Sequence, residues 1–245
     1  MSCLLQRLCI TLTGLLVVAC SGAVRWDQAP AEQPRTSVPG SRDADGRARP
    51  AEHRVQAGET LYGIAFGYGL DVASLAAWNG LGDGTLIRVG QVLRLTPPTG
   101  ATATRATDNP AVGVVEAPPR WQWPAAGPVL VRYGESPLTA SGVQLGGQPG
   151  DLVRAASGGQ VVYAGNGLVG YGELLIIKHS ANWLSAYGYN RALLVREGEQ
   201  VDAGQPIARM GEGPSPGLRG RRSLLHFEIR RNGIPVDPLS QLPAR

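Results

Sequence analysis

Two stretches that are poor in apolar residues limit what this chain can fold into. Residues 21–52 and 97–120 consist mainly of Ala, Pro, Arg, Thr, Asp and Gly, and the second carries two Pro-Pro pairs. Such stretches cannot bury enough apolar surface to offset the entropy lost on ordering them. A folded core therefore lies in residues 53–96 or 121–245. With 34 Gly and 19 Pro in 245 residues, we expect turns and β-strands to outweigh helices.

Residues 1–20 have the pattern of a secretory signal, because Arg7 precedes an uninterrupted apolar or neutral run. The run is too short for a comfortable membrane-spanning helix. It ends in Val17-Val18-Ala19-Cys20, which resembles a bacterial lipobox, so we expect Cys20 to become the lipidated first residue of the mature chain. An ordinary signal peptide cut near Ala19 is the alternative.

The remaining cysteines, Cys3 and Cys9, also lie in this signal, which excludes a disulfide framework or a cysteine metal site elsewhere. Several acyl chains on Cys20 would anchor the chain stably to a membrane. Position 21, directly after Cys20, holds serine rather than aspartate, which resembles the sorting signal of outer-membrane lipoproteins. Residues 21–52 would then form a flexible tether with a typical end-to-end distance of about 30 Å.

Residues 53–96 predict a compact unit in the order strand, helix, helix, strand. The first strand is expected at residues 54–56, and Thr60 is a good N-cap for the first helix. Asp71 is a cap for the second helix, whose apolar residues recur at helical spacing. Residues 92–95 would close the unit as its second strand.

This unit closely resembles a LysM domain over its whole length. The matching residues are Val55, Gly58-Glu59-Thr60-Leu61, Ile64-Ala65, Leu75, Trp78-Asn79, Val89-Gly90-Gln91 and Leu93. The resemblance implies binding to the N-acetylglucosamine-containing strands of peptidoglycan. The implied contacts are Gly58, Glu59, Thr60 and Leu61 in one loop, with Leu86 and Ile87 in the facing loop. Helix capping and core packing are the alternative roles of these residues.

From residue 121 onward, short apolar segments alternate with Gly- and Pro-containing turns, and no helical period is sustained. Strands are expected at residues 129–133, 159–164, 173–179, 183–187, 207–210 and 224–230. This spacing predicts an antiparallel sheet or sandwich. The fold class is therefore multidomain, with a small α+β (βααβ) unit at 53–96, a linker at 97–120 and a mainly-β domain at 121–245.

The mainly-β domain resembles the LytM, or lysostaphin-type, zinc peptidases over nearly its full length. The matching stretches are Trp123-Pro124 and residues 158–165, 170–172, 175–179, 201–208 and 226–230. Active members hold one zinc with the His and Asp of an H-x-G-x-D stretch and the last His of an H-x-H stretch, and use two further histidines in catalysis. In this chain the corresponding positions hold Ala140, Gln144, Tyr189 and Leu224, and only His226 is retained.

A catalytic zinc needs about three protein ligands and an open position for water. One imidazole does not supply them, so we expect no catalytic residue, no metal and no cofactor. His226 is then either a core histidine or, with Tyr189 and Leu224, part of a groove refilled by apolar and aromatic side chains. Such a groove can serve as a docking site for another protein. Residues 211–222 are expected to form a plain surface loop, or a mobile loop over this groove.

A lipobox, a LysM domain and a degenerate LytM domain, in this order, resemble the NlpD-type murein hydrolase activators. The resemblance implies an outer-membrane lipoprotein, enriched at the division septum, that does no chemistry itself. It would bind peptidoglycan and activate a periplasmic N-acetylmuramoyl-L-alanine amidase through the groove, so that daughter cells separate. The alternatives are a structural tether between outer membrane and peptidoglycan, or a residual zinc endopeptidase. The net charge is +4, and the basic residues are scattered along the chain, so they do not indicate a nucleic-acid partner.

Overall fold

The computed structural model describes residues 37–42, 48–82, 84–98, 117–137, 140–215 and 220–245. The predicted signal sequence, Cys20 and most of both predicted linkers lie outside the described residues. Strands β1 (Ser37–Arg42) and β2 (Ala48–Pro50) pair antiparallel within the predicted tether. Part of that stretch therefore has β-structure.

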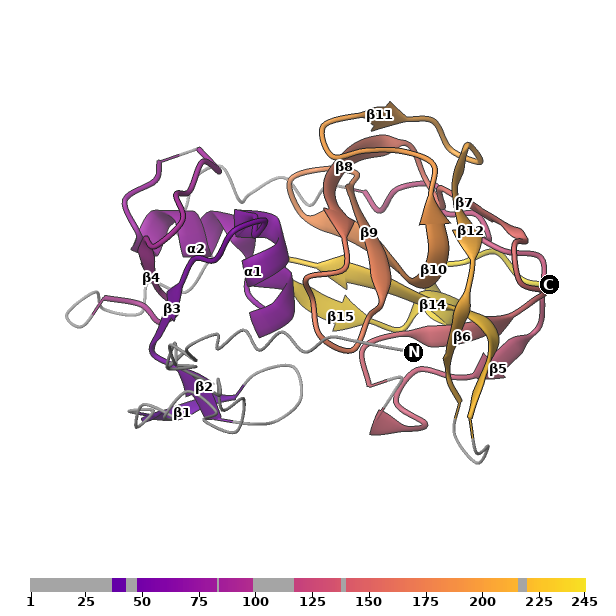
Figure 1. The fold of residues 1–245 in the computed structure, drawn as a ribbon, viewed down its shortest axis with the longest axis horizontal. Coiled ribbons are helices and arrows are strands. Elements are labelled where there is room, and N and C mark those ends of the chain that lie inside the picture. Colours follow the sequence, from indigo (N-terminus) through magenta and orange to yellow (C-terminus); the bar gives the residue numbers. More distant parts are fainter. Residues whose placement is uncertain (1–36, 43–47, 83, 99–116, 138–139, 216–219) are drawn as a thin grey trace, which may run out of the picture. The chain divides into compact units, whose positions relative to one another are not determined.

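The predicted order of strand, helix, helix and strand is confirmed in residues 52–94 (Figure 1). Strand β3 (Glu52–Arg54) pairs antiparallel with β4 (Val92–Arg94), and helices α1 (Leu61–Tyr68) and α2 (Val72–Trp78) connect them. Strand β3 begins at Glu52 rather than at residue 54, because Glu52 pairs with the last residue of β4. Pairing with a distant strand decides this boundary.

Both helices begin at the residues that the sequence predicts as caps. The Thr60 hydroxyl accepts a hydrogen bond from the Gly63 amide at 3.0 Å, and the Asp71 carboxylate accepts one from the Ser74 amide at 2.8 Å. Each cap satisfies an amide that the first helical turn leaves unpaired. The helices pack over a core formed by Val55, Leu61, Ile64, Ala65, Leu70, Leu75, Ala76, Leu93 and Leu95.

The C-terminal domain is a mainly-β structure built on one large antiparallel sheet with the strand order β11-β8-β9-β10-β14-β6-β5. Figure 1 shows β9, β10 and β14 running through its middle. Strand β12 pairs with β10 and β7, whereas β13 and β15 pair with β14. The elements are β5 (Val129–Val131), β6 (Val143–Gly146), β7 (Leu152–Arg154), β8 (Gly159–Gly165), β9 (Glu173–Lys178), β10 (Trp183–Leu193), β11 (Gln200–Val201), β12 (Pro206–Met210), β13 (Glu212–Pro214), β14 (Arg221–Arg231), β15 (Ile234–Val236) and the 3-10 helix η2 (Pro238–Ser240).

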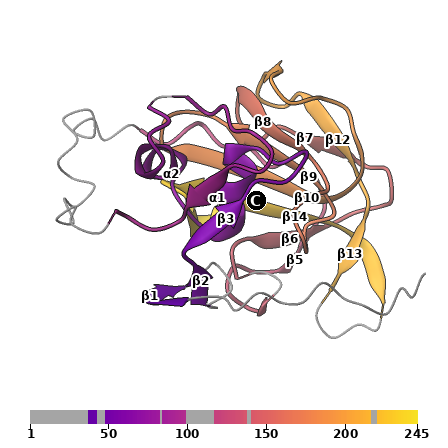
Figure 2. The same cartoon turned by 60° about the vertical axis from the view of Figure 1, so that its left-hand side comes forward.

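All six strands predicted for this domain are present, but the short strands β6, β7, β11, β13 and β15 were not predicted. The expectation of a plain surface loop at residues 211–222 is wrong for part of that segment. There, β13 pairs antiparallel with the first residues of β14 (Figure 2). The reason is that β14 extends beyond its neighbours and offers free backbone groups to a Gly- and Pro-containing segment.

The side chains of strand β14 alternate between the two faces of the sheet. Leu225, Phe227 and Ile229 point into the main core, together with residues such as Val143, Leu145, Leu175, Ile177, Tyr187, Ile207 and Met210. Because side chains alternate along a strand, Leu224, His226, Glu228 and Arg230 lie on the opposite face. We call this opposite face of the sheet the site face.

Candidate functional site

Four of the five positions that the sequence resemblance assigns to metal ligands and catalytic histidines come together on the site face. His226 pairs with Gln144 across the β6–β14 ladder, and Leu224 follows on the same side of β14. The ring of Tyr189, from β10, lies 6.1 Å from the His226 ring between centroids. Ala140 is the exception, because it is exposed in the turn before β6.

Gly142 occupies a position in the turn before β6 where a side chain has no room. A Cβ atom at this position would lie 2.4 Å from the Phe227 carbonyl oxygen and 3.1 Å from Cε1 of His226. Only a residue without a side chain allows the backbone to approach β14 so closely. Gly142 therefore lets the turn before β6 lie close to β14.

The side chains at this place are buried, with exposed fractions of 0% for Gln144 and Leu224, 4% for His226 and 8% for Tyr189. Strand β13 covers them. A Cβ atom on Gly213 would lie 2.5 Å from the Tyr189 ring, and Gln144 Nε2 donates a hydrogen bond to the Pro214 carbonyl oxygen at 3.0 Å. The predicted docking groove of Tyr189, Leu224 and His226 thus remains a prediction, and in this structure its residues lie beneath β13.

Tyr189 has an unusual backbone conformation, with a φ angle of +61°. This left-handed region costs a non-glycine residue of the order of 1–3 kcal/mol. Two hydrogen bonds hold it: the Tyr189 amide donates to the Tyr171 carbonyl at 2.7 Å, and its own carbonyl accepts from the Gly211 amide at 2.9 Å. The conformation turns the Tyr189 ring over His226 at the point where the register of β10 shifts.

A buried polar network continues along the site face from His226. His226 Nε2 donates to the Glu228 carboxylate at 2.9 Å, and Arg230 Nε donates to its other oxygen at 2.8 Å. The Tyr171 hydroxyl also donates to Glu228, at 3.0 Å. Burial by itself would raise the pKa of Glu228, but Arg230 and His226 lower that pKa to about 2. Burial raises the pKa of Tyr171, so its hydroxyl stays protonated.

Glu228 and Arg230 were not predicted as part of the site. The signal was available, because His226, Glu228 and Arg230 alternate along one predicted strand and must share a face. What the sequence did not show is that this face is buried, with exposed fractions of 0% for Glu228 and 1% for Arg230.

The residues on the site face do not fit a zinc ion. Among the residues that the structure describes, no group of three or more His, Cys, Asp or Glu side chains is placed to hold a metal. Nε2 of His226 is taken by Glu228, while Nδ1 of His226 and Oε1 of Gln144 have no hydrogen-bond partner in the described part of the chain. One imidazole nitrogen and one neutral amide oxygen are a poor ligand set for zinc.

The other histidine of this domain, His179, is held by hydrogen bonds to its neighbours. Its Nδ1 donates to the Gly158 carbonyl at 2.7 Å, and its Nε2 lies 2.7 Å from the Ser185 hydroxyl. The Ser185 hydroxyl lies 2.8 Å from that of Tyr187, which accepts from the Ala156 amide at 2.8 Å. Burial lowers the pKa of His179 to about 4, against the opposing effect of the Gly158 carbonyl.

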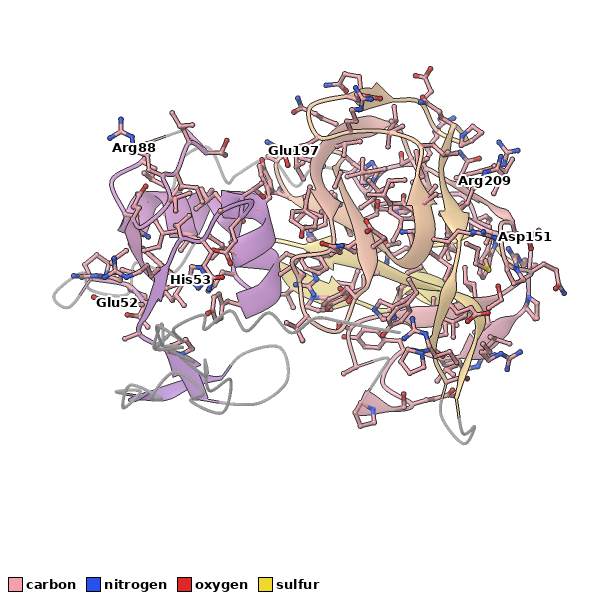
Figure 3. The ribbon with its side chains drawn as sticks, viewed as in Figure 1. Glu52, His53, Arg88, Asp151, Glu197 and Arg209 are labelled. Atoms are coloured by element: carbon pink, nitrogen blue, oxygen red, sulfur yellow. The ribbon has the colours of Figure 1, made fainter. Side chains whose placement is uncertain are left out.

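In residues 52–95, the four predicted glycan-binding residues of the first loop each have a different environment. Leu61 is fully buried in the core, and Thr60 caps α1. The Glu59 carboxylate accepts from the Gln56 amide at 2.7 Å and lies 2.7 Å from Nε2 of His53, which Figure 3 labels. Gly58 has a φ angle of +83°, which favours glycine.

The facing loop is the more accessible part of the predicted glycan site. Leu86 is 82% exposed, whereas Ile87 packs partly against the core. A surface hollow of about 530 Å³ is lined by Leu81, Leu86, Arg88, Val89 and Gln91. Exposed apolar side chains beside polar ones suit the faces and hydroxyls of a sugar, so glycan binding at this loop remains a prediction that the surface supports.

The chain matches two family models, the LysM domain over residues 53–96 and peptidase family M23 over residues 139–238. It is 41% identical over 250 residues to a lipoprotein NlpD/LppB homolog of Pseudomonas aeruginosa, which covers 84% of this chain and 82% of that protein. The chain belongs to the NlpD/LppB lipoprotein family. Within this family, the residue 53–96 unit is the LysM domain and the mainly-β domain is the M23 domain.

A second relative is the murein hydrolase activator NlpD of Escherichia coli, which is 48% identical over 125 residues, or 51% of this chain and 32% of that protein. Among solved structures, a zinc-containing peptidase from Vibrio cholerae aligns with a TM-score of 0.43 and 23% identity, over 52% of this chain and 40% of that one. In the described part of this NlpD/LppB chain, no helix is long and apolar enough to cross a membrane.

Proposed function

We propose that this NlpD/LppB lipoprotein is a non-catalytic activator of a periplasmic N-acetylmuramoyl-L-alanine amidase. A lipid on Cys20 would anchor it to the outer membrane, and the LysM domain would bind peptidoglycan strands. The M23 domain would bind the amidase and relieve its autoinhibition. Septal peptidoglycan would then be opened so that daughter cells separate.

The observation that carries the proposal is the state of the M23 site. By the sequence resemblance, Gln144, Tyr189 and Leu224 replace groups that would bind zinc or move protons, while the backbone packs closely against β14 at Gly142. A peptidase fold that keeps its shape without its ligands is better suited to binding than to hydrolysis. The relatives that carry the name murein hydrolase activator support the same conclusion.

The structure also constrains how an amidase would meet this site. Because β13 covers Tyr189, Leu224 and His226, the partner meets the β13–β14 hairpin first. Arg221 and Arg222 are exposed there. To move an amidase from 1% to 99% open, the activator must bind the open form more tightly by about 5.5 kcal/mol. The LysM domain and the lipid would raise the local concentration rather than add contacts to the amidase.

The test is dye release from labelled peptidoglycan by the purified chain alone, by an amidase alone and by the two together. The proposal expects release above the amidase level only in the mixture, and no effect of a chelator on the chain itself. Chelator-sensitive release by the chain alone would establish a residual zinc endopeptidase instead. Release in the mixture that equals the amidase alone would contradict activation.

The burial of Tyr189, Leu224 and His226 favours a second candidate, a tether with an inert M23 domain. Charge reversal at the exposed arginines of the hairpin separates the two. Arg221→Glu with Arg222→Glu should lower amidase activation, whereas Arg209→Glu on the exposed side of β12 (Figure 3) should not. A tether would pellet with peptidoglycan equally well in all three forms and stimulate no amidase in any of them.

A further inference from the structure

Helix α1 of the LysM domain has two apolar faces. Leu61, Ile64 and Ala65 pack into the LysM core. Tyr62 and Phe66, four residues apart and therefore on one side of the helix, belong to a different cluster. That cluster lies in the M23 domain and contains Val162, Tyr163, Leu174, Ile176 and Ala186, with Leu168, Tyr171 and Leu184 packed against it. Phe66 is only 2% exposed.

Arg230 of β14 makes the central contact with α1. Its guanidinium carbon lies 3.5 Å from the centroid of the Phe66 ring, and its Nη1 donates to the Phe66 carbonyl oxygen at 2.7 Å. A cation over an aromatic face is a favourable contact, more so when it is shielded from water. The same guanidinium holds Glu228 through Nε, so one buried side chain joins the helix to the polar network.

Glycines allow the close approach. A Cβ atom on Gly63 would lie 3.0 Å from the Tyr163 ring, and one on Gly67 would lie 3.1 Å from Cδ2 of Leu168. In the turn between β14 and β15, a Cβ atom on Gly233 would lie 2.4 Å from the Leu70 backbone. At Gly233 a side chain would clash with the Leu70 backbone, and at Gly63 and Gly67 it would crowd the Tyr163 and Leu168 side chains.

Two chains of contacts connect Phe66 of α1 to His226, one through Tyr171 and one through Arg230 and Glu228. The Tyr171 ring lies 5.4 Å from the Phe66 ring and 5.7 Å from the His226 ring, between centroids. In parallel, Arg230 contacts Glu228, and Glu228 accepts from His226. Whatever binds the site face near His226 therefore has α1 as a neighbour.

We propose that the site face of the M23 sheet is a binding surface for helix α1, and that α1 shields this face from other proteins. The LysM domain would be an internal ligand that has to leave before a partner can use the surface around Tyr171 and Arg230. The shielding of an amidase rests on the function proposed above, whereas the docking of α1 does not.

The docking is tested by hydrogen exchange in the full chain, comparing Phe66→Lys with Ala77→Lys, an exposed position on α2. The lysine at position 66 would bury a second cation beside Arg230 and separate the domains. Amides of residues 171–178 and 224–231 should then exchange about tenfold faster than in the unchanged chain, and Ala77→Lys should leave them unchanged. The Arg94 amide donates to Oδ1 of Asn79 within the LysM domain, so unchanged protection at Arg94 would show that this domain is still folded.

The shielding is tested with the same proteins in the dye-release mixture. If docking restricts the open form to about a tenth of the molecules, Phe66→Lys should raise amidase stimulation up to tenfold at limiting concentration. Equal exchange in the unchanged chain and the variant would overturn the docking. Faster exchange with unchanged or weaker stimulation would overturn the shielding. Absence of stimulation by every form would contradict the proposed function, and the exchange data would still decide the docking.

Discussion

Gln144 lies directly opposite His226 across the β6–β14 ladder, and its amide nitrogen is bonded to the backbone of β13 at Pro214. The sequence resemblance predicts that Gln144 stands where LytM-type zinc peptidases carry a ligand carboxylate. In this structure its uncharged side chain helps to hold the strand that covers the site.

Restoring ligands should restore zinc binding. Gln144→Asp combined with Ala140→His supplies two groups beside His226 and brings the set to three, the number that a catalytic zinc site needs. We expect stoichiometric zinc in the purified double variant, measured by metal analysis after dialysis, and none in Ala140→His alone. A zinc-free double variant would show that the turn at Ala140 cannot reach His226.

The buried pair of Glu228 and Arg230 should be sensitive to losing one partner. Arg230→Met leaves Glu228 charged and uncompensated, which should destabilise the M23 domain by about 3–5 kcal/mol in urea unfolding. Adding Glu228→Gln should recover a large part of that loss, because no isolated charge remains. If the double variant is no more stable than Arg230→Met, the charge on Glu228 is not the cause.

Glu228 should also make the stability of the folded chain decrease at acid pH. Its pKa is lowered to about 2 in the folded chain, so the unfolded state binds protons more readily. Its contribution is fully present above the ordinary pKa of a glutamate, near 4.5, and is lost as the pH falls from there toward 2. Stability measured across this window should fall less steeply in Glu228→Gln than in the unchanged chain.

His179 should produce a separate loss of stability at milder pH. Its folded pKa of about 4 lies below the ordinary 6.5, so the neutral form is favoured by folding. Stability is complete above pH 6.5 and decreases as the pH falls toward 4, by about 3 kcal/mol for this difference in pKa. In His179→Gln, the free energy of unfolding measured between pH 6.5 and 4 should lose this decrease. His53→Gln, in the LysM domain, serves as the control and should show the same decrease as the unchanged chain.

Thr60 combines a capping role with a predicted glycan contact, and the two can be separated. Thr60→Ala and Asp71→Ala each remove an N-cap and should each destabilise the LysM domain by about 1 kcal/mol. Only Thr60→Ala should also weaken pelleting with peptidoglycan, measured well below the unfolding temperature. Equal binding by both variants would leave Thr60 with the cap alone.

The elements that depend on local chemistry were predictable from the sequence. Thr60 and Asp71 cap helices because their side chains reach amides within the same turn, and β14 alternates because successive side chains must point to opposite faces. The assignment of Gln144, Tyr189 and Leu224 to former ligand and catalytic positions rests on the sequence motifs alone and stays a prediction.

Tertiary structure alone decided what those residues do. The short strands β6 and β13 exist because β14 pairs with them, and no local signal in a Gly- and Pro-containing segment predicts a distant partner. Tyr189 adopts its left-handed backbone because Tyr171 and Gly211 hold it there. Phe66 looks like one more apolar residue of a short helix until Arg230 is placed against its ring. Local propensity acts over a few residues, whereas burial depends on which surfaces meet, and that is settled only when the whole sheet has formed.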